Sequence, residues 1–189
     1  MTIAGANLIG GLWIAWIAYW LIASRSVKQD RRQESALSRA AHIVPLMIAA
    51  CLLWAPDFPG VLGERFLPDA PATFWTGFAL VVFGLGFTVW ARLVLGRNWS
   101  GIVTVKQDHE LITAGPYRWV RHPIYTGLLF AFAGSAIARG EWRGVLAVVV
   151  VFAGFWRKLR LEERWMIETF GDAYLRYRAK VRALIPFVL

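Results

Sequence analysis

The amino-acid sequence predicts an all-α, polytopic integral membrane protein with about five transmembrane helices. First, 58% of its 189 residues are hydrophobic and the mean hydropathy is +0.49, which is too apolar for an ordinary soluble domain. Second, the apolar residues are gathered in long runs without charge. Third, lysine and arginine flank these runs instead of interrupting them, as is typical of membrane proteins.

Five apolar segments are expected to form the helices. The third is the clearest span, and Gly77, Gly84 and Gly86 along it favour close helix packing. In the second, Pro45 fits the first helical turn or a kink. The fifth has twelve residues, about 18 Å of helix, so we expect it to continue beyond the membrane as an amphipathic extension that ends at Gly171. The segments are Asn7–Ala23, His42–Ala55, Phe74–Leu95, Ile124–Ala138 and Val145–Trp156.

The distribution of positive charge predicts the orientation. All of the 21 Lys and Arg residues except Arg65, Arg139 and Arg143 fall within residues 25–39, 92–121 and 157–182, on one side of the expected bundle. The positive-inside rule makes that side cytoplasmic. We therefore expect five crossings, with the N-terminus outside and the C-terminus in the cytoplasm.

Composition also argues against several classes of function. A net charge of +9 would indicate nucleic-acid binding in a soluble protein, but here the basic residues follow the membrane topology, so we expect no nucleic-acid partner. Cys51 is the only cysteine, which excludes a disulfide framework. His42, His109 and His122 lack the spacing of metal ligands, so no metal site is expected. No basic residue precedes the first apolar run, so we expect it to be retained rather than removed as a signal peptide.

The segment His109–Gly127, HELITAGPYRWVRHPIYTG, is polar, basic and rich in rings, and it lies between two apolar helices. Pro123 favours the first turn of the helix that follows. A helix N-terminus offers unpaired N–H groups and partial positive charge. With Arg121 and His122 beside it, this segment predicts a cytosolic cradle for a carboxylate or phosphate.

The helix of the last apolar run carries a second candidate group on the same side. Lys158 and Glu162 are four residues apart and share a helix face, while Glu163 lies about 100° round. An exposed ion pair would contribute little, but ionisable groups near a membrane boundary are usually paired or functional. These residues alone indicate a membrane enzyme or carrier with a cytosolic site for an anionic ligand.

The two segments together resemble a known family. HELITAGPYRWVRHPIYTG, followed by EERWMIETFGDAYLRYRAKVRALIPF, is similar to the isoprenylcysteine carboxyl methyltransferase family and its bacterial and phospholipid-methyltransferase relatives. The resemblance begins at about Leu95 and covers the C-terminal half. We therefore divide the chain into N-terminal transmembrane helices, residues 1–95, and a methyltransferase-like half, residues 96–189, that forms a cytosolic cofactor pocket.

The resemblance implies a methyltransferase that uses S-adenosyl-L-methionine and a lipophilic acceptor, such as a membrane lipid or a prenylated small molecule. It places the adenine end of the cofactor on His109–Ile112 and packs Tyr117 against the cofactor. The methionine part lies at the start of the helix that begins near Pro123, and the facing helix supplies carboxylates. Arg121 can balance the methionine carboxylate. The implied cofactor-binding residues are His109, Glu110, Leu111, Ile112, Tyr117, Arg121, His122, Pro123, Ile124, Tyr125, Glu162 and Glu163.

One departure concerns the acceptor. Where the carboxyl methyltransferases carry an arginine before the paired glutamates, this chain has Lys158, with Arg157 beside it, and we assign acceptor positioning to these two residues. Lysine does not replace arginine at a bidentate carboxylate site, so the acceptor need not be an isoprenylcysteine. The short N-terminal half is typical of bacterial relatives and points to a bacterial inner membrane. Two alternatives remain, an NADPH-dependent sterol-type reductase and a non-catalytic membrane protein of the same fold.

Overall fold

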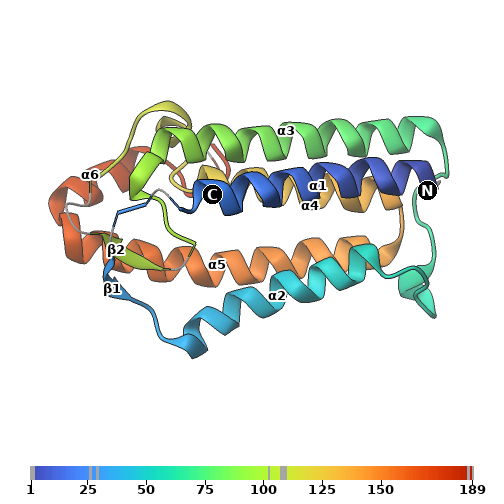
Figure 1. The fold of residues 1–189 in the computed structure, drawn as a ribbon, viewed down its shortest axis with the longest axis horizontal. Helices are drawn as coiled ribbons and strands as arrows, with labels where there is room; N and C mark the ends of the chain where they lie inside the picture. The colour runs from blue at the N-terminus through green and yellow to red at the C-terminus, as the bar shows by residue number, and fades with distance from the viewer. Residues whose placement is uncertain are drawn as a thin grey trace.

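Five long helices run side by side along the molecule, and a smaller polar assembly closes one end (Figure 1). The computed structural model describes residues 3–25, 27–28, 30–101, 103–106, 110–186 and 188. The helices are α1 (Ile3–Ala23), α2 (Ala36–Trp54), α3 (Pro71–Leu95), α4 (Pro123–Arg139), α5 (Trp142–Phe170) and α6 (Asp172–Lys180). Three 3-10 turns connect them, η1 (Val61–Gly63), η2 (Gly96–Asn98) and η3 (Gly115–Arg118).

The expected helices are present, and the helical class is confirmed. Helix α5 runs without a break from the apolar run into the polar extension, and Gly171 ends it with a φ of 51°, a conformation that favours glycine. Helix α2 differs from the prediction, because it begins at Ala36 rather than His42. Ser35 caps its N-terminus by accepting a hydrogen bond from the Ser38 N–H, so Pro45 lies inside the helix and not in its first turn.

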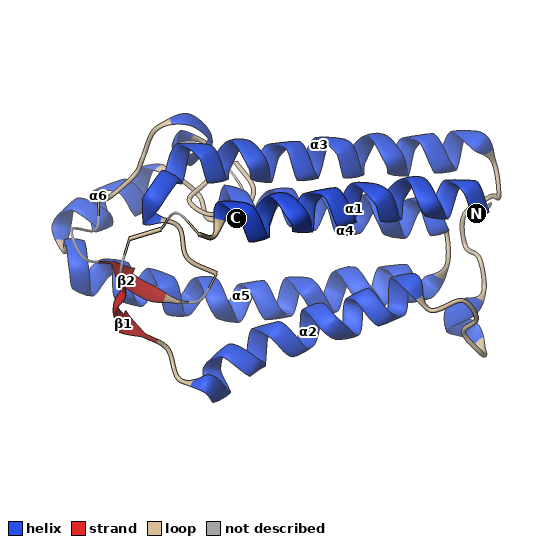
Figure 2. Ribbon diagram, in the orientation of Figure 1, coloured by secondary structure: helices blue, strands red, loops and turns tan. Residues whose placement is uncertain are grey.

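A short sheet was not predicted. β1 (Asp30–Gln33) and β2 (Thr104–Lys106) pair antiparallel near the end that carries α6, as Figure 2 shows in red. The two strands join the α1–α2 linker to the loop after α3, although some 70 residues separate them in the sequence. Strands of three and four residues carry too little alternation for sequence patterns to detect. The sheet therefore adds a long-range contact at the polar end of the bundle.

Two of the helices have the length and composition of membrane spans. Within the described residues these are Ala36–Trp54 and Pro71–Asn98, with mean hydropathies of 1.8 and 2.1, and only 22% and 33% of their apolar windows are buried inside the protein. A core helix of a soluble protein would be mostly buried. The apolar side chains that face outward, among them Met47 and Phe83, fit helices surrounded by lipid. The number of crossings remains a prediction.

Helices α3 and α4 approach so closely that glycine is required at their contact. A Cβ on Gly84 would lie 2.4 Å from the Gly127 carbonyl oxygen, and one on Gly77 would lie 2.5 Å from the Gly134 oxygen. The predicted packing role therefore holds for these two residues. It does not hold for Gly86, where a Cβ would meet no atom within 4 Å.

This contact predicts opposite effects for two neighbouring substitutions. Gly84→Ala is expected to lower the free energy of unfolding by about 1–3 kcal/mol, because backbone atoms of α4 must move away from the new methyl group. Gly86→Ala is the matched control and should be neutral or stabilising by up to about 1 kcal/mol, since alanine favours the helix. Equilibrium unfolding of both variants in detergent micelles measures the difference. Equal stability of the two variants would contradict the close contact.

Arg139 and Arg143, whose side chains are 11% and 2% exposed, close the opposite end of the bundle. Arg143 donates to Glu141 Oε2 (2.5 Å) and to the Ala55 carbonyl oxygen (2.8 Å), and Arg139 donates to the Leu53 oxygen (2.7 Å). These bonds satisfy carbonyl groups at the C-terminal end of α2. The arginines predicted to lie in loops opposite the candidate site therefore hold α2 against the α4–α5 turn.

Candidate functional site

The site is built around the start of α4. Its N-cap is His122, whose side chain makes no capping hydrogen bond, and Pro123 occupies the first helical turn as predicted. The turn η3 precedes it and buries Tyr117. The imidazole of His122 is therefore not used to cap its own helix and extends toward α5.

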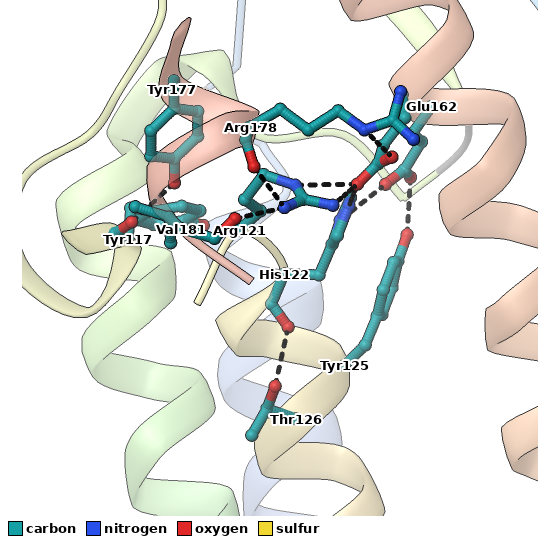
Figure 3. A network of polar contacts seen from close by, with 10 residues as sticks. Tyr117, Arg121, His122, Tyr125, Thr126, Glu162, Tyr177, Arg178 and Val181 are labelled. Carbon is teal, nitrogen blue, oxygen red and sulfur yellow. Dashed lines mark hydrogen bonds and ion pairs between the residues drawn. The ribbon is translucent and has the colours of Figure 1, made fainter. Parts of the chain in front are cut away.

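Two adjacent glutamates of α5 hold this imidazole between them (Figure 3). His122 Nε2 lies 3.3 Å from Glu163 Oε1, and Nδ1 lies 3.5 Å from Glu162 Oε2. Arg121 donates from Nε (2.8 Å) and Nη2 (2.5 Å) to Glu163 Oε1, and the Tyr125 hydroxyl donates to Glu162 Oε1 (2.5 Å). Because both ring nitrogens of His122 face carboxylates, the cluster is complete only with a protonated imidazole.

The pKa shifts of these groups agree with that assignment. Burial opposes ionisation of Glu163, but the hydrogen bond and charge of His122, together with Arg121, lower its pKa to about 2. Burial also opposes ionisation of Glu162, and the hydrogen bond from His122 and the charge of Lys158 outweigh it, so this pKa is lowered too. Burial lowers the pKa of His122, whereas its two carboxylate partners raise it, and the net shift is upward from 6.5. These groups lie beyond the apolar run of α5, on the polar end of the molecule.

A pH dependence follows from these shifts. The raised pKa of His122 contributes stability that is complete below about 6.5 and is lost as the pH rises through the folded-state value. The lowered pKa values of Glu162 and Glu163 contribute stability that is present above 4.5 and is lost as the pH falls through their folded-state values, which for Glu163 is about 2. We expect maximal stability of the cluster between about pH 4.5 and 6.5. Melting curves from pH 5 to 9 should therefore fall on the alkaline side, and His122→Gln should flatten that fall; a slope unchanged by His122→Gln would contradict the assignment.

The C-terminal segment of the chain docks on the same helix start. The Arg121 and His122 N–H groups donate to the carbonyl oxygens of Arg182 (2.8 Å) and Ala183 (3.0 Å), and Thr126 Oγ1 donates to the Leu184 oxygen (2.7 Å). The Arg121 guanidinium also donates to the Val181 carbonyl oxygen. These bonds use the N–H groups of the two residues before α4 and fix the segment that follows α6 beside them.

A second bond secures α6 to the turn before α4. The Tyr177 hydroxyl donates to the Tyr117 carbonyl oxygen (2.5 Å), and both residues line the cavity described next. The tyrosines of α6, Tyr174 and Tyr177, therefore form a wall of the site.

A cavity of about 390 Å³ opens in front of the cluster, within the range of roughly 300–1,000 Å³ that small-molecule sites occupy. Its polar wall contains Arg121, His122 and Glu162. Its remaining walls include apolar side chains from α1, α2, α4 and α5, namely Trp16, Trp20, Leu46, Leu128 and Phe155. Such a cavity suits a molecule that is charged at one end and apolar at the other. No group of three or more His, Cys, Asp or Glu side chains able to hold a metal ion occurs in the described part of the chain.

The structure brings most of the residues implied by the resemblance to this cavity. Those that line it are Glu110, Leu111, Ile112, Tyr117, Arg121, His122, Pro123, Ile124, Tyr125 and Glu162. Glu163 is not among the lining residues and is buried behind Arg121 and His122, with its side chain 5% exposed. His109 lies outside the described residues.

Of the two candidates for acceptor positioning, only one lines the cavity. Lys158 lines the cavity and donates to the Gly101 carbonyl oxygen (3.0 Å). Arg157 is exposed and donates to the Ser38 carbonyl oxygen (3.1 Å) at the start of α2. One residue along a helix turns the side chain by about 100°, which carries Arg157 away from the cavity.

Several lining residues lie outside the motifs on which the resemblance rests. From the N-terminal helices these include Trp16 and Trp20, whose rings stack with centroids 4.5 Å apart. Their i,i+4 spacing on an apolar helix is a signal that both face one side, but it does not say what that side meets. The loop after α3 contributes Asn98, Trp99, Ser100, Gly101 and Thr104.

Comparison with known proteins gives a consistent result. The family model described as phospholipid methyltransferase matches residues 72–173. Protein-S-isoprenylcysteine O-methyltransferase of Mus musculus is 31% identical over 153 residues, which cover 78% of this chain and 53% of that protein. The enzyme of the same name from Saccharomyces cerevisiae is 33% identical over 152 residues, covering 79% of this chain and 63% of that protein. The chain thus spans about half the length of the mouse relative.

A solved structure shares the fold. It is that of the eukaryotic intramembrane Ras methyltransferase ICMT, isoprenylcysteine carboxyl methyltransferase, with a TM-score of 0.51 and 24% sequence identity. The match covers 84% of this chain and 55% of that one. It extends the likeness over most of the helices described above.

Proposed function

Because the chain belongs to the phospholipid methyltransferase family, we propose that it is a membrane methyltransferase that takes its methyl group from S-adenosyl-L-methionine. The acceptor we propose is lipophilic and carries a carboxylate, as an isoprenylcysteine does. The observation that carries the proposal is the charged cluster of Arg121, His122, Glu162 and Glu163 at the wall of an otherwise apolar cavity. The relatives named above support methyl transfer rather than the reductase alternative.

The side chains at the cavity match the charges of the proposed donor. S-adenosyl-L-methionine supplies a methyl group on a sulfonium sulfur, and transfer is an in-line displacement in which the O–CH₃ bond forms as the S–CH₃ bond breaks. Arg121 and His122 provide positive charge for the methionine carboxylate, and Glu162 provides negative charge for the ammonium group or the ribose hydroxyls. Leu111, Ile112 and Tyr117 provide apolar and ring surface for the adenine end.

The rest of the cavity suits the proposed acceptor. Lys158, on the cavity wall, offers a single ammonium for the acceptor carboxylate, and the rings of Trp16, Trp20 and Phe155 offer apolar surface for its lipid part. A carboxylate acceptor is already ionised near neutral pH and needs no general base. The protein's task is then to align the two substrates and exclude water. In this proposal Lys158 alone positions the acceptor, and Arg157 contacts the start of α2 instead.

The proposed topology has five crossings with the N-terminus outside and the cavity on the cytoplasmic side, in a bacterial inner membrane. It is supported by the location of the cavity at the end of the bundle where the basic segments gather. Arg65, Arg139 and Arg143, the exceptions to the charge bias, lie at the other end. Labelling of single cysteines introduced at either end, in intact cells, tests the orientation.

Transfer of labelled methyl groups tests the proposed activity. The purified protein in lipid nanodiscs is incubated with methyl-labelled S-adenosyl-L-methionine and a farnesylated cysteine that has a free carboxylate, and base-labile label in the lipid fraction is counted. The proposal expects label that is released by mild base, as from a methyl ester. Base-stable label would show that the acceptor atom is nitrogen rather than oxygen. If no label is found even when lipid extracts are supplied as acceptor, the proposal is contradicted.

A further inference from the structure

A buried ionisable pair lies outside the site described so far. Glu34 precedes α2 and His42 lies in its second turn, and Glu34 Oε1 is 3.2 Å from His42 Nε2. Their side chains are 1% and 3% exposed. Neither residue lines the cavity, and neither belongs to residues 72–173, which match the family model.

Burial of this pair is expensive. Glu34 Oε2 and both ring nitrogens of His42 are buried without a hydrogen-bond partner in the described part of the chain. Buried polar atoms of this kind cost free energy that other contacts must offset. Apolar side chains of similar size would often give a protein that is at least as stable. The presence of this pair therefore points to a role other than stability.

Glu34 of this pair holds one residue of the loop after α3. Val103 N donates to Glu34 Oε1 (3.0 Å), and Glu34 N donates to the Val103 carbonyl oxygen (3.0 Å). This exchange extends the β1–β2 pairing by one position, next to the Gln33–Thr104 pair. Val103 is thereby fixed from both its N–H and its carbonyl group.

The loop so fixed is a wall of the cavity. Trp99, Ser100, Gly101 and Thr104 line it, and the Gly101 carbonyl oxygen accepts the hydrogen bond of Lys158 Nζ (3.0 Å). Gly101 is two residues from Val103. A shift of Val103 therefore moves the group that orients the Lys158 ammonium.

We propose that Glu34 and His42 are positioning residues that hold Val103, and with it the wall residues Gly101 and Thr104, against the cavity and so orient Lys158 toward the acceptor. The inference rests on the proposed function and adds to it two residues from the N-terminal half of the chain. Their effect passes through the acceptor side of the cavity. The cluster of Arg121, His122 and Glu162 shares no hydrogen bond with them.

Kinetics of labelled methyl transfer test the acceptor effect. Glu34→Ala is expected to raise the KM for the acceptor by at least about tenfold, as the loss of a buried hydrogen bond to a charged group implies, while affinity for S-adenosylhomocysteine changes less than about twofold. Glu34→Gln keeps an oxygen for the Val103 N–H and should restore part of the loss. Leu37→Ala is the matched control, because Leu37 is three residues further along, is 82% exposed and does not line the cavity, so Val103 stays held and the acceptor KM should not change.

A measurement without turnover separates this inference from the proposed function. Val103→Cys in a Cys51→Ser background places a thiol where the side chain is 1% exposed, so alkylation by a water-soluble maleimide should be slow. Glu34→Ala should accelerate it by at least about tenfold if the loop opens. If the wild-type protein transfers no methyl group, acceleration would still show that Glu34 holds Val103, and the missing transfer would refute the proposed function and the orienting of an acceptor.

Three results would overturn the inference. One is an alkylation rate that Glu34→Ala does not change. Another is faster alkylation with an unchanged acceptor KM in an active protein. The third is a parallel loss of S-adenosylhomocysteine binding, which would show a general folding role.

Discussion

Arg121→Ala is expected to lower the free energy of unfolding by about 3–5 kcal/mol, the cost of leaving a buried charge without its partner. The Arg121 side chain is 8% exposed and Glu163 5%. The same guanidinium donates to the carbonyl oxygens of Val181 and Arg178, so its loss also removes two contacts with the C-terminal segment. Chemical unfolding in mixed micelles, followed by intrinsic fluorescence, measures the change.

Two comparisons make this prediction specific. Arg118→Ala removes an exposed arginine that lies over the Trp119 ring, with its guanidinium carbon 5.2 Å from the centroid, and should change stability by less than about 0.5 kcal/mol. Arg121→Lys keeps the charge but loses the planar guanidinium, so its loss of stability should lie between those of Arg118→Ala and Arg121→Ala. If Arg121→Ala were no less stable than Arg118→Ala, the buried cluster would not be the structural centre of the site.

Glu162→Ala is expected to weaken binding of S-adenosylhomocysteine by at least about 30-fold. Truncation of one partner in a buried, hydrogen-bonded charged group costs roughly 2–5 kcal/mol. Glu162 accepts from Tyr125, faces His122 and lines the cavity, so its loss removes a ligand group and loosens two others. Isothermal titration of the detergent-purified variant measures the affinity.

The control for this variant lies on the same helix. Glu168→Ala replaces an exposed glutamate of α5 that is not among the cavity-lining residues, and should leave affinity unchanged within about twofold. Glu162→Gln keeps the acceptor for the Tyr125 hydroxyl and isolates the effect of charge. Wild-type affinity in Glu162→Ala would remove this carboxylate from the cofactor site.

The polar half of the fold is well predicted by the sequence because its signals are local. Pro123 marks the start of α4, and Gly171, with its positive φ, marks the end of α5. A run of twelve apolar residues followed by spaced charges predicted that one helix would continue without a break into a polar extension, as α5 does. The residues brought together by the α4 start were adjacent in sequence, so their meeting needed no tertiary information.

What the sequence did not predict depends on contacts between distant segments. Ser35 starts α2 six residues earlier than its apolar run suggests, because a cap outweighs composition at a helix end. The pairing of β1 with β2 and the contribution of Trp16 and Trp20 to the cavity arise only when the N-terminal helices pack on the C-terminal half. The divergence of Lys158 and Arg157 depends on helix phase, which shifts by about 100° per residue.

The most direct test of the central claim is titration of the purified wild-type protein with S-adenosylhomocysteine, alongside NADPH and the His122→Ala variant. The proposed function predicts micromolar binding of S-adenosylhomocysteine, loss of that binding in His122→Ala, and no binding of NADPH. Binding of NADPH without S-adenosylhomocysteine would contradict it and favour a reductase. Binding of neither ligand by folded protein would contradict it as well and favour a non-catalytic role for this fold.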